Sequence, residues 1–77
     1  MDIITAQDAI HAVCIRRRKW TYLYRLHETA AGFDADIYTR MADPRSLNKL
    51  FEIVGLRVDG IAQIGNELFR FKMVIVP

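Results

Sequence analysis

A chain of 77 residues has room for one domain, and its 52% hydrophobic and 26% charged residues, with a formal net charge of +2, are typical of a folded globule rather than a disordered segment. No apolar run is longer than that of residues 73–76, which is far shorter than the roughly 20 residues of a spanning helix, and the first residues do not resemble a signal peptide. We therefore expect a cytoplasmic protein of one domain, residues 1–77, with no membrane partner. The single cysteine, Cys14, excludes an intrachain disulfide, so association is the remaining way to stabilise so small a core.

The N-terminal segment has the pattern of an amphipathic helix. Thr5 and Asp8 have the spacing of a capping box, with Asp8 where Glu is commoner. Apolar residues then recur at steps of three and four, at Ala6, Ala9, Ile10, Val13 and Cys14. The pattern predicts a helix over residues 6–18, with basic residues in its last turn, where the helix dipole favours cations.

After this helix the period changes to two. Trp20, Tyr22, Tyr24 and Leu26 share one parity, and aromatic enrichment of this kind favours a strand. Residues 29–34 are typical of a turn, and alternation resumes through residue 41. The two segments predict a hairpin.

A second helix is predicted after Asp43 and Pro44, which suit the N-cap and the first helical position. Its apolar face is made by residues at i, i+3, i+4 and i+7, namely Leu47, Leu50, Phe51 and Val54. Gly55 is placed to end this helix in a left-handed conformation.

The last segment predicts a second hairpin. Leu56, Val58, Ala62 and Ile64 share a parity, with Gly60 as a bulge, and Gly65-Asn66 is a two-residue turn signal. The final strand alternates at Phe69, Phe71, Met73 and Ile75, and becomes apolar on both faces near its end, which favours a central strand or a covered edge. The order α-β-β-α-β-β predicts an α+β fold: a four-stranded antiparallel sheet with two helices packed on one face.

Few residues suggest chemistry. His11, Cys14 and His27 are the only His and Cys residues, and Cys14 lies on the apolar stripe, as a buried hydrophobe does. Their spacing matches no zinc motif, and the four glycines are too dispersed for a phosphate loop. We expect no metal, no cofactor, no catalytic residue and no enzyme activity.

The basic cluster is the most distinctive feature of the sequence. Arg16, Arg17, Arg18 and Lys19 run directly into the aromatic strand. An open sheet face with aromatic residues beside arginines can stack single-stranded bases, whereas consecutive cations at a helix end are often only solvated. If the aromatic row faces the core instead, the exposed face carries a different and still basic set, namely Arg25, Tyr38, Arg40, Arg70 and Lys72.

Surplus apolar residues favour a protein interface. They fall off the predicted core stripes, at Ile15, Ile53, Ile61, Leu68, Val74 and Val76. Arg and Tyr are also favoured at interface centres, and a strand at the end of the chain could extend the sheet of a partner. A homodimer is one form of such an interface.

Two resemblances concern the whole chain rather than particular residues. The order of elements is similar to the core of LAGLIDADG endonucleases, whose motif is absent from this sequence. The length and the lack of a catalytic motif resemble small phage- or plasmid-encoded inhibitors such as anti-CRISPR proteins, and this likeness implies an inhibitor or accessory factor that occupies a host complex.

The prediction is a non-enzymatic binding protein that docks on a protein partner, with a nucleic-acid-binding module as the alternative. The expected partner-binding residues are the basic cluster and the alternative exposed row, that is Arg16, Arg17, Arg18, Lys19, Arg25, Tyr38, Arg40, Arg70 and Lys72.

Overall fold

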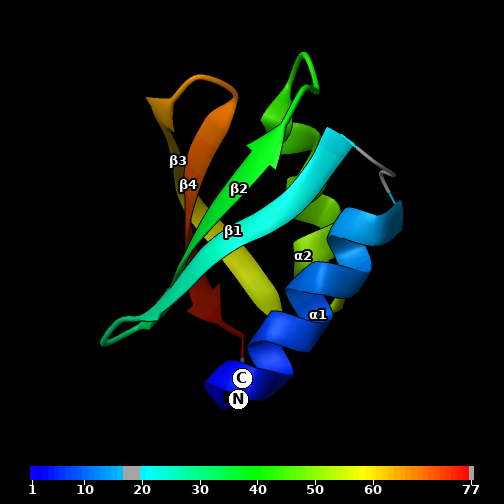
Figure 1. Ribbon diagram of the computed structural model, residues 1–77. Helices are drawn as coiled ribbons and strands as arrows, with labels where there is room; N and C mark the ends of the chain where they lie inside the picture. The colour runs from blue at the N-terminus through cyan, green and yellow to red at the C-terminus, as the bar shows by residue number, and fades with distance from the viewer. Residues whose placement is uncertain (17–19, 77) are drawn as a thin grey trace.

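The protein, described over residues 1–16 and 20–76 by a computed structural model, has two layers (Figure 1). The elements in chain order are α1 (Ile3–Arg16), β1 (Thr21–Glu28), β2 (Gly32–Thr39), the 3₁₀ helix η2 (Pro44–Leu47), α2 (Asn48–Ile53), β3 (Leu56–Gly65) and β4 (Leu68–Ile75). The strands form one antiparallel sheet in the order β1-β2-β4-β3, and the helices lie on one side of it. The predicted α+β fold is confirmed, and the strand order, which the sequence left open, places β2 and β4 at the centre.

Helix α1 begins earlier than predicted. The carboxylate of Asp2 accepts a hydrogen bond of 2.7 Å from the backbone N–H of Thr5, so Asp2 acts as the N-cap and the capping box starting at Thr5 is wrong. A short acidic side chain at the positive end of the helix serves this role as well as Thr does. The buried stripe is confirmed at Ala6, Ile10, Val13 and Cys14. The helix is described as far as Arg16, and the rest of the predicted final turn lies outside the described residues.

The first hairpin is tighter than predicted, because β2 already begins at Gly32. The hydroxyl of Thr29 accepts the N–H of Gly32 at 3.1 Å and closes the turn. A Cβ at Gly32 would overlap the carbonyl oxygen of Met73 on β4, so only glycine lets the two central strands approach here. Residues 32–34, predicted as turn, are therefore strand.

The second helical segment begins as predicted but is wound differently. The side chain of Asp43 accepts the backbone N–H of Arg45 at 3.1 Å, and Pro44 follows as the first helical residue. The first turn is a 3₁₀ turn, and the α-helix proper starts only at Asn48. Gly55 ends the segment with φ of +89°, which confirms the predicted left-handed conformation.

The second hairpin differs from the prediction in two details. Its turn lies one residue later, at Asn66 and Glu67, and Glu67 rather than a glycine has the positive φ, +59°. Strand β3 carries two bulges, at Asp59 and Ile64, where one extra residue interrupts the register with β4. The bulge at Asp59 reverses the side-chain alternation of β3. The prediction that Ala62 shares a face with Leu56 and Val58 is therefore wrong.

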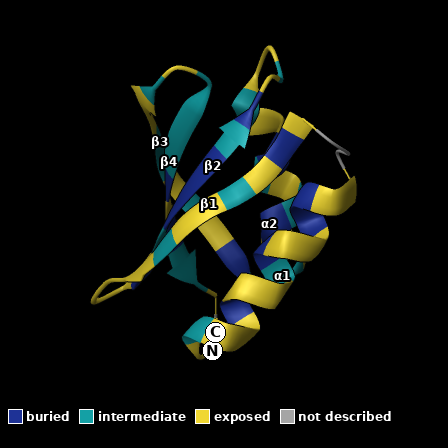
Figure 2. Cartoon of the chain, in the orientation of Figure 1, coloured by how far each residue is buried: buried dark blue, intermediate teal, exposed yellow. Residues whose placement is uncertain are grey.

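The hydrophobic core fills the space between the sheet and the two helices (Figure 2). Its largest fully buried apolar side chains are Phe33, Phe51, Phe71, Ile10, Ile37, Leu47 and Leu56. Phe51 of α2 meets Phe71 of β4 edge to face, with ring centroids 5.6 Å apart. The predicted alternation of β4 is confirmed, since Phe71 and Met73 are buried while Lys72 is exposed. Because β4 lies at the centre of the sheet, the predicted addition of this strand to the sheet of a partner is wrong.

Candidate functional site

The face of the sheet away from the helices, called the open face below, carries both groups of side chains that the sequence had offered as alternatives. Leu23 pairs with Ile37 and Arg25 pairs with Asp36, so Tyr24 is an extra residue that forms a bulge. A bulge shifts the side-chain alternation by one residue. The aromatic residues before the bulge and the basic residues after it therefore lie on the same face, and the interpretation that buried the aromatic row in the core is wrong.

Four aromatic residues form a cluster at one end of the open face. This aromatic cluster consists of Trp20, Tyr22, Tyr24 and Tyr38. Tyr22 and Tyr38 stack across β1 and β2 with ring centroids 5.0 Å apart, and Tyr24 meets Tyr38 edge to face at 5.4 Å. Trp20, Tyr22 and Tyr24 remain 48%, 51% and 55% exposed, which is unusual for large aromatic side chains.

The rings of the aromatic cluster use their faces on one another and on arginines. The guanidinium of Arg40 lies over the indole of Trp20, 4.4 Å from its centroid, and that of Arg25 lies 5.4 Å from the ring centre of Tyr24. Such contacts are attractive because the ring face carries partial negative charge. The cluster is thus held by contacts within this chain, and about half of Trp20, Tyr22 and Tyr24 still reaches solvent.

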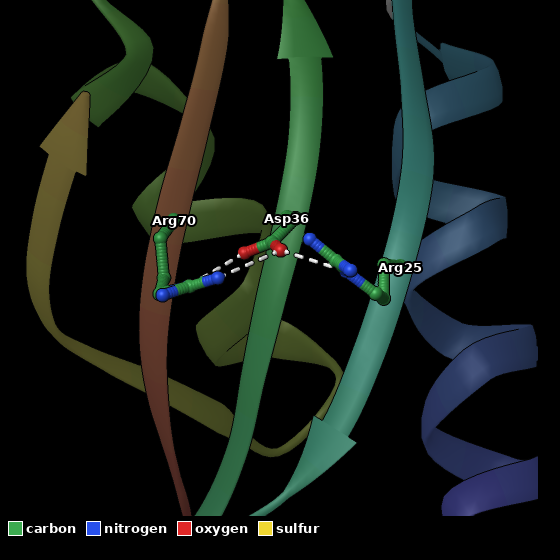
Figure 3. Close-up of polar contacts among 3 residues, drawn as sticks. All are labelled: Arg25, Asp36 and Arg70. Atoms are coloured by element: carbon green, nitrogen blue, oxygen red, sulfur yellow. Dashed lines mark hydrogen bonds and ion pairs between the residues drawn. The ribbon is translucent and has the colours of Figure 1, made fainter. Parts of the chain in front are cut away.

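Next to the aromatic cluster, two arginines share one buried carboxylate (Figure 3). Arg25 of β1 and Arg70 of β4 flank Asp36 of β2 in the sheet register. Arg70 donates from Nε at 2.8 Å and from a terminal nitrogen at 3.1 Å, while Arg25 donates from Nε at 3.3 Å. The side chain of Asp36 is completely buried, whereas those of Arg25 and Arg70 are 51% and 37% exposed.

The two arginines keep Asp36 ionised and are themselves the charges that reach solvent. Hydrogen bonds from Arg70, with its positive charge and the contacts of Arg25, hold the pKa of Asp36 below its ordinary value, against desolvation, which acts to raise it. The carboxylate is therefore ionised at neutral pH and hidden, while the guanidinium groups that cover it reach solvent. A partner approaching this row meets cations first.

A depression of about 400 Å³ lies at the end of the open face where the aromatic cluster meets the turn of the second hairpin. Its lining includes Trp20, Tyr22, Tyr38, Arg40 and Glu67. Arg40 and Glu67 form an ion pair of 2.8 Å across it. The depression is thus bordered by aromatic rings and by one closed ion pair.

Of the predicted partner-binding residues, the structure brings five together on the open face, namely Arg25, Tyr38, Arg40, Arg70 and Lys72. Arg16 is exposed at the end of α1, in the helical layer. Arg17, Arg18 and Lys19 lie outside the described residues.

Two parts of the site were missing from the predicted set. Asp36 was overlooked because an acid in an alternating strand is normally a solvated residue, and only the strand order shows that arginines flank it on both sides. The aromatic residues of β1 were recognised, but their face was ambiguous. The one available signal was the spacing of Leu23 and Leu26, which lie three apart, so that both can face the core only if a bulge intervenes.

The residues weighed for metal or nucleophilic chemistry are not brought together. Cys14 is buried among core residues, and burial raises the pKa of its thiol to about 11, so the thiolate needed for either chemistry is disfavoured. His11 is exposed on α1, and His27 lies on β1, opposite Asp34. Within residues 1–16 and 20–76, no three His, Cys, Asp or Glu side chains lie close enough to hold a metal ion.

Comparisons of the chain with protein-family models, with curated proteins and with solved structures gave no match. In the part of the chain that the structure describes, no helix has the length and apolar character needed to cross a bilayer.

Proposed function

We propose that this chain is a small non-enzymatic binding protein that docks on a protein partner through the open face of its sheet. The observation that supports this proposal is the aromatic cluster, whose Trp20, Tyr22 and Tyr24 are about half exposed on a face that neither helix covers. Trp, Tyr and Arg are the residues that most often contribute the binding free energy at the centre of protein interfaces. By occupying a surface of its partner, such a protein would act as an inhibitor or accessory factor.

The state of the aromatic rings favours a protein over a nucleic acid. Base stacking needs free ring faces, and Tyr22 and Tyr38 already use one face on each other while Arg40 covers one face of Trp20. About half of each exposed ring remains accessible, and this area suits contacts with peptide groups and side chains. Tyr is common in protein-binding surfaces because it offers apolar area and a hydrogen bond at little cost in conformational entropy.

The ion pairs of the open-face arginines also favour a protein partner over a nucleic acid. Arg25, Arg40 and Arg70 are each already bound to a carboxylate of this chain. A phosphate backbone would have to compete with those carboxylates, and high nucleic-acid affinity rests on cations that are available for phosphates. A nucleic-acid-binding module remains the second candidate, favoured by one observation: four consecutive basic residues, Arg16 to Lys19, directly precede Trp20 at the edge of the open face.

A site-specific cross-link tests the proposal. A benzophenone amino acid at position 24, within the aromatic cluster, is compared with the same group at the exposed Ala12 of α1, on the opposite layer. After irradiation in a lysate of the cells of origin, we expect a protein adduct from position 24 that excess wild-type chain suppresses, and none from position 12. Equal adducts from both positions would refute docking by the open face.

Nucleic-acid binding, the second candidate function, is tested by a separate measurement. Labelled single- and double-stranded oligonucleotides are titrated at low and at physiological salt. Tight binding that falls steeply with salt would indicate phosphate contacts and would favour the nucleic-acid-binding function. We expect only weak binding, because the three arginines of the open face, Arg25, Arg40 and Arg70, are already paired with carboxylates of this chain.

A further inference from the structure

The open face is not level, because β3 presents almost no side-chain volume on it from Gly60 to Gly65. The β3 residues that pair with Lys72, Arg70 and Leu68 of β4 are small, namely Gly60, Ala62 and Gly65. A Cβ placed on Gly60 would meet no atom within 4 Å, so space is open above this residue. On the other side of β4, β1 and β2 carry large side chains on the same face, namely Tyr22, Tyr24, Arg25 and Tyr38. The result is a hollow beside the arginine pair.

The size of this hollow limits what can enter it. It has a volume of about 190 Å³ and is lined by Gly60, Ile61, Ala62, Arg70 and Lys72. Sites for small molecules usually measure about 300–1,000 Å³, so this space suits one or two amino-acid side chains better than a free ligand. Its floor consists of glycine and alanine, against which methylene groups can pack.

The charges at the hollow specify the kind of side chain. Among the described residues Lys72 makes no ion pair, and the guanidinium of Arg70 keeps one terminal nitrogen that makes no hydrogen bond to a described residue. The two rows of paired residues beside the hollow contain three cations, Arg25, Arg70 and Lys72. The same rows contain two carboxylates, Asp34 and Asp36. Asp36 is buried under the arginines and the nearby Asp59 is paired with Arg57, so an excess of positive charge faces the hollow.

We propose that this hollow receives an acidic side chain of the protein partner. Its methylene groups pack on Gly60 and Ala62, and its carboxylate binds the ammonium of Lys72 and the outer edge of the Arg70 guanidinium. Asp36 holds Arg70 in place for this contact through two hydrogen bonds and is therefore a positioning residue. The inference rests on the proposed function and adds the chemistry of the anchoring residue.

One pair of variants tests the shape of the hollow. Ala62→Leu fills the space, and Ala12→Leu makes the same change at an exposed position of α1. Ala62 is exposed, so the fold should be preserved; thermal unfolding checks this, and Gly60→Ala serves as a smaller filling if Ala62→Leu unfolds. We expect Ala62→Leu to reduce the adduct formed from position 24 about tenfold, the effect of losing one well-packed charged contact, and Ala12→Leu to leave it unchanged.

A second pair tests the charge. Lys72→Glu reverses the charge at the hollow, and Lys49→Glu makes the same reversal on the exposed side of α2. We expect the adduct to fall with Lys72→Glu, to persist with Lys49→Glu, and to be largely retained with Lys72→Arg. An adduct that survives both Ala62→Leu and Lys72→Glu would overturn the hollow as an anchor, although docking by the open face would still stand.

A titration that needs no partner completes the test. ¹⁵N-labelled protein is mixed with acetylated and amidated tetraglutamate, and with tetraglutamine as the uncharged control. Saturable shifts of the amide resonances of Gly60, Ala62 and Lys72, in the millimolar range and only with tetraglutamate, are expected. No shift there, or larger shifts of the same resonances with oligothymidylate, would overturn the inference, whereas the absence of any adduct from position 24 would count against the proposed function alone.

Discussion

The two faces of the sheet are built from the same strands and held together by different forces. On β2, Phe33, Ala35 and Ile37 enter the core beneath the helices, while Asp34, Asp36 and Tyr38 alternate with them on the open face. The covered face is stabilised by removing apolar surface from water. The open face has no covering layer, and its order comes from contacts between neighbouring strands: a tyrosine stack, an arginine over an indole and a carboxylate shared by two arginines.

This difference shows how a chain of 77 residues can keep a large aromatic surface available. Exposed cross-strand aromatic and charged pairs each contribute only about 0.2–1 kcal/mol, far less than a buried side chain, so they order the surface without closing it. The buried carboxylate of Asp36 is the exception on this face. The stability of the domain should therefore depend mainly on the covered face, and partner binding mainly on the open face. Four substitutions test that division, in order of decreasing effect on stability.

The largest effect is expected from Phe71→Ala in the covered face. Phe71 is fully buried and packs against Phe51, so its truncation should lower the free energy of unfolding by about 3–5 kcal/mol. Urea denaturation measures the loss, and Phe71→Leu, which keeps most of the volume, provides a milder variant if Phe71→Ala does not fold. A loss below about 1 kcal/mol would mean that Phe71 is packed only loosely in the core.

Asp36→Ala should lower the free energy of unfolding by about 3 kcal/mol. This is the low end for breaking a buried ion pair, because both arginines keep part of their hydration. The effect should depend on pH. The pKa of Asp36 is lowered by folding, so its contribution is complete above the unfolded value of about 4 and disappears as the pH falls through the lower, folded value.

The stability difference between wild type and Asp36→Ala should thus be constant at neutral pH and shrink in acid. Urea denaturation at several pH values measures this, with the exposed Asp8→Ala as a control that should change little. A difference that grows in acid would contradict the assignment of Asp36 as an ionised, hydrogen-bonded carboxylate.

Tyr22→Ala should separate binding from stability. Removing the half-exposed ring loses the stack on Tyr38, worth about 0.5–1.5 kcal/mol, and should abolish most of the adduct formed from position 24. Thermal unfolding and cross-linking are compared in the same preparations. Tyr22→Phe keeps the stack and should retain stability, so an equal loss of stability in both variants would show that the hydroxyl matters more than the ring.

Glu67→Gln is expected to have the smallest effect. Its ion pair with Arg40 is short, 2.8 Å, but both side chains are more than one-third exposed, so the loss should be below about 0.5 kcal/mol. Chemical denaturation at low and high salt measures it. A larger loss would show that this ion pair also holds Arg40 over Trp20 and so belongs to the ordering of the aromatic cluster.

Much of the fold could be predicted because its signals are local. The stripe from Ala6 to Cys14, the N-cap Asp43 and the left-handed Gly55 each depend on residues close in sequence, and each is confirmed. Helix ends were less predictable, since Asp2 and Thr5 both suit an N-cap and only the structure distinguishes them.

The binding surface was harder to predict because it depends on register between distant strands. The bulges at Tyr24 and Asp59 determine which residues share a face, and alternation alone gives no position for them. The burial of Asp36 requires Arg70, which is 34 residues away in the sequence, to lie on the neighbouring strand. Residue types therefore indicated a binding surface, whereas its layout required the strand order.

The three bulges have a consequence for how the molecule behaves among copies of itself. All of them lie in the two edge strands, at Tyr24 in β1 and at Asp59 and Ile64 in β3, while the register between the central strands β2 and β4 is unbroken. An edge strand with regular hydrogen-bonding groups can recruit another strand and begin aggregation, and a bulge interrupts that repeat. Both margins of the sheet thus carry a feature that disfavours growth into a fibril, although the open face is rich in aromatic residues.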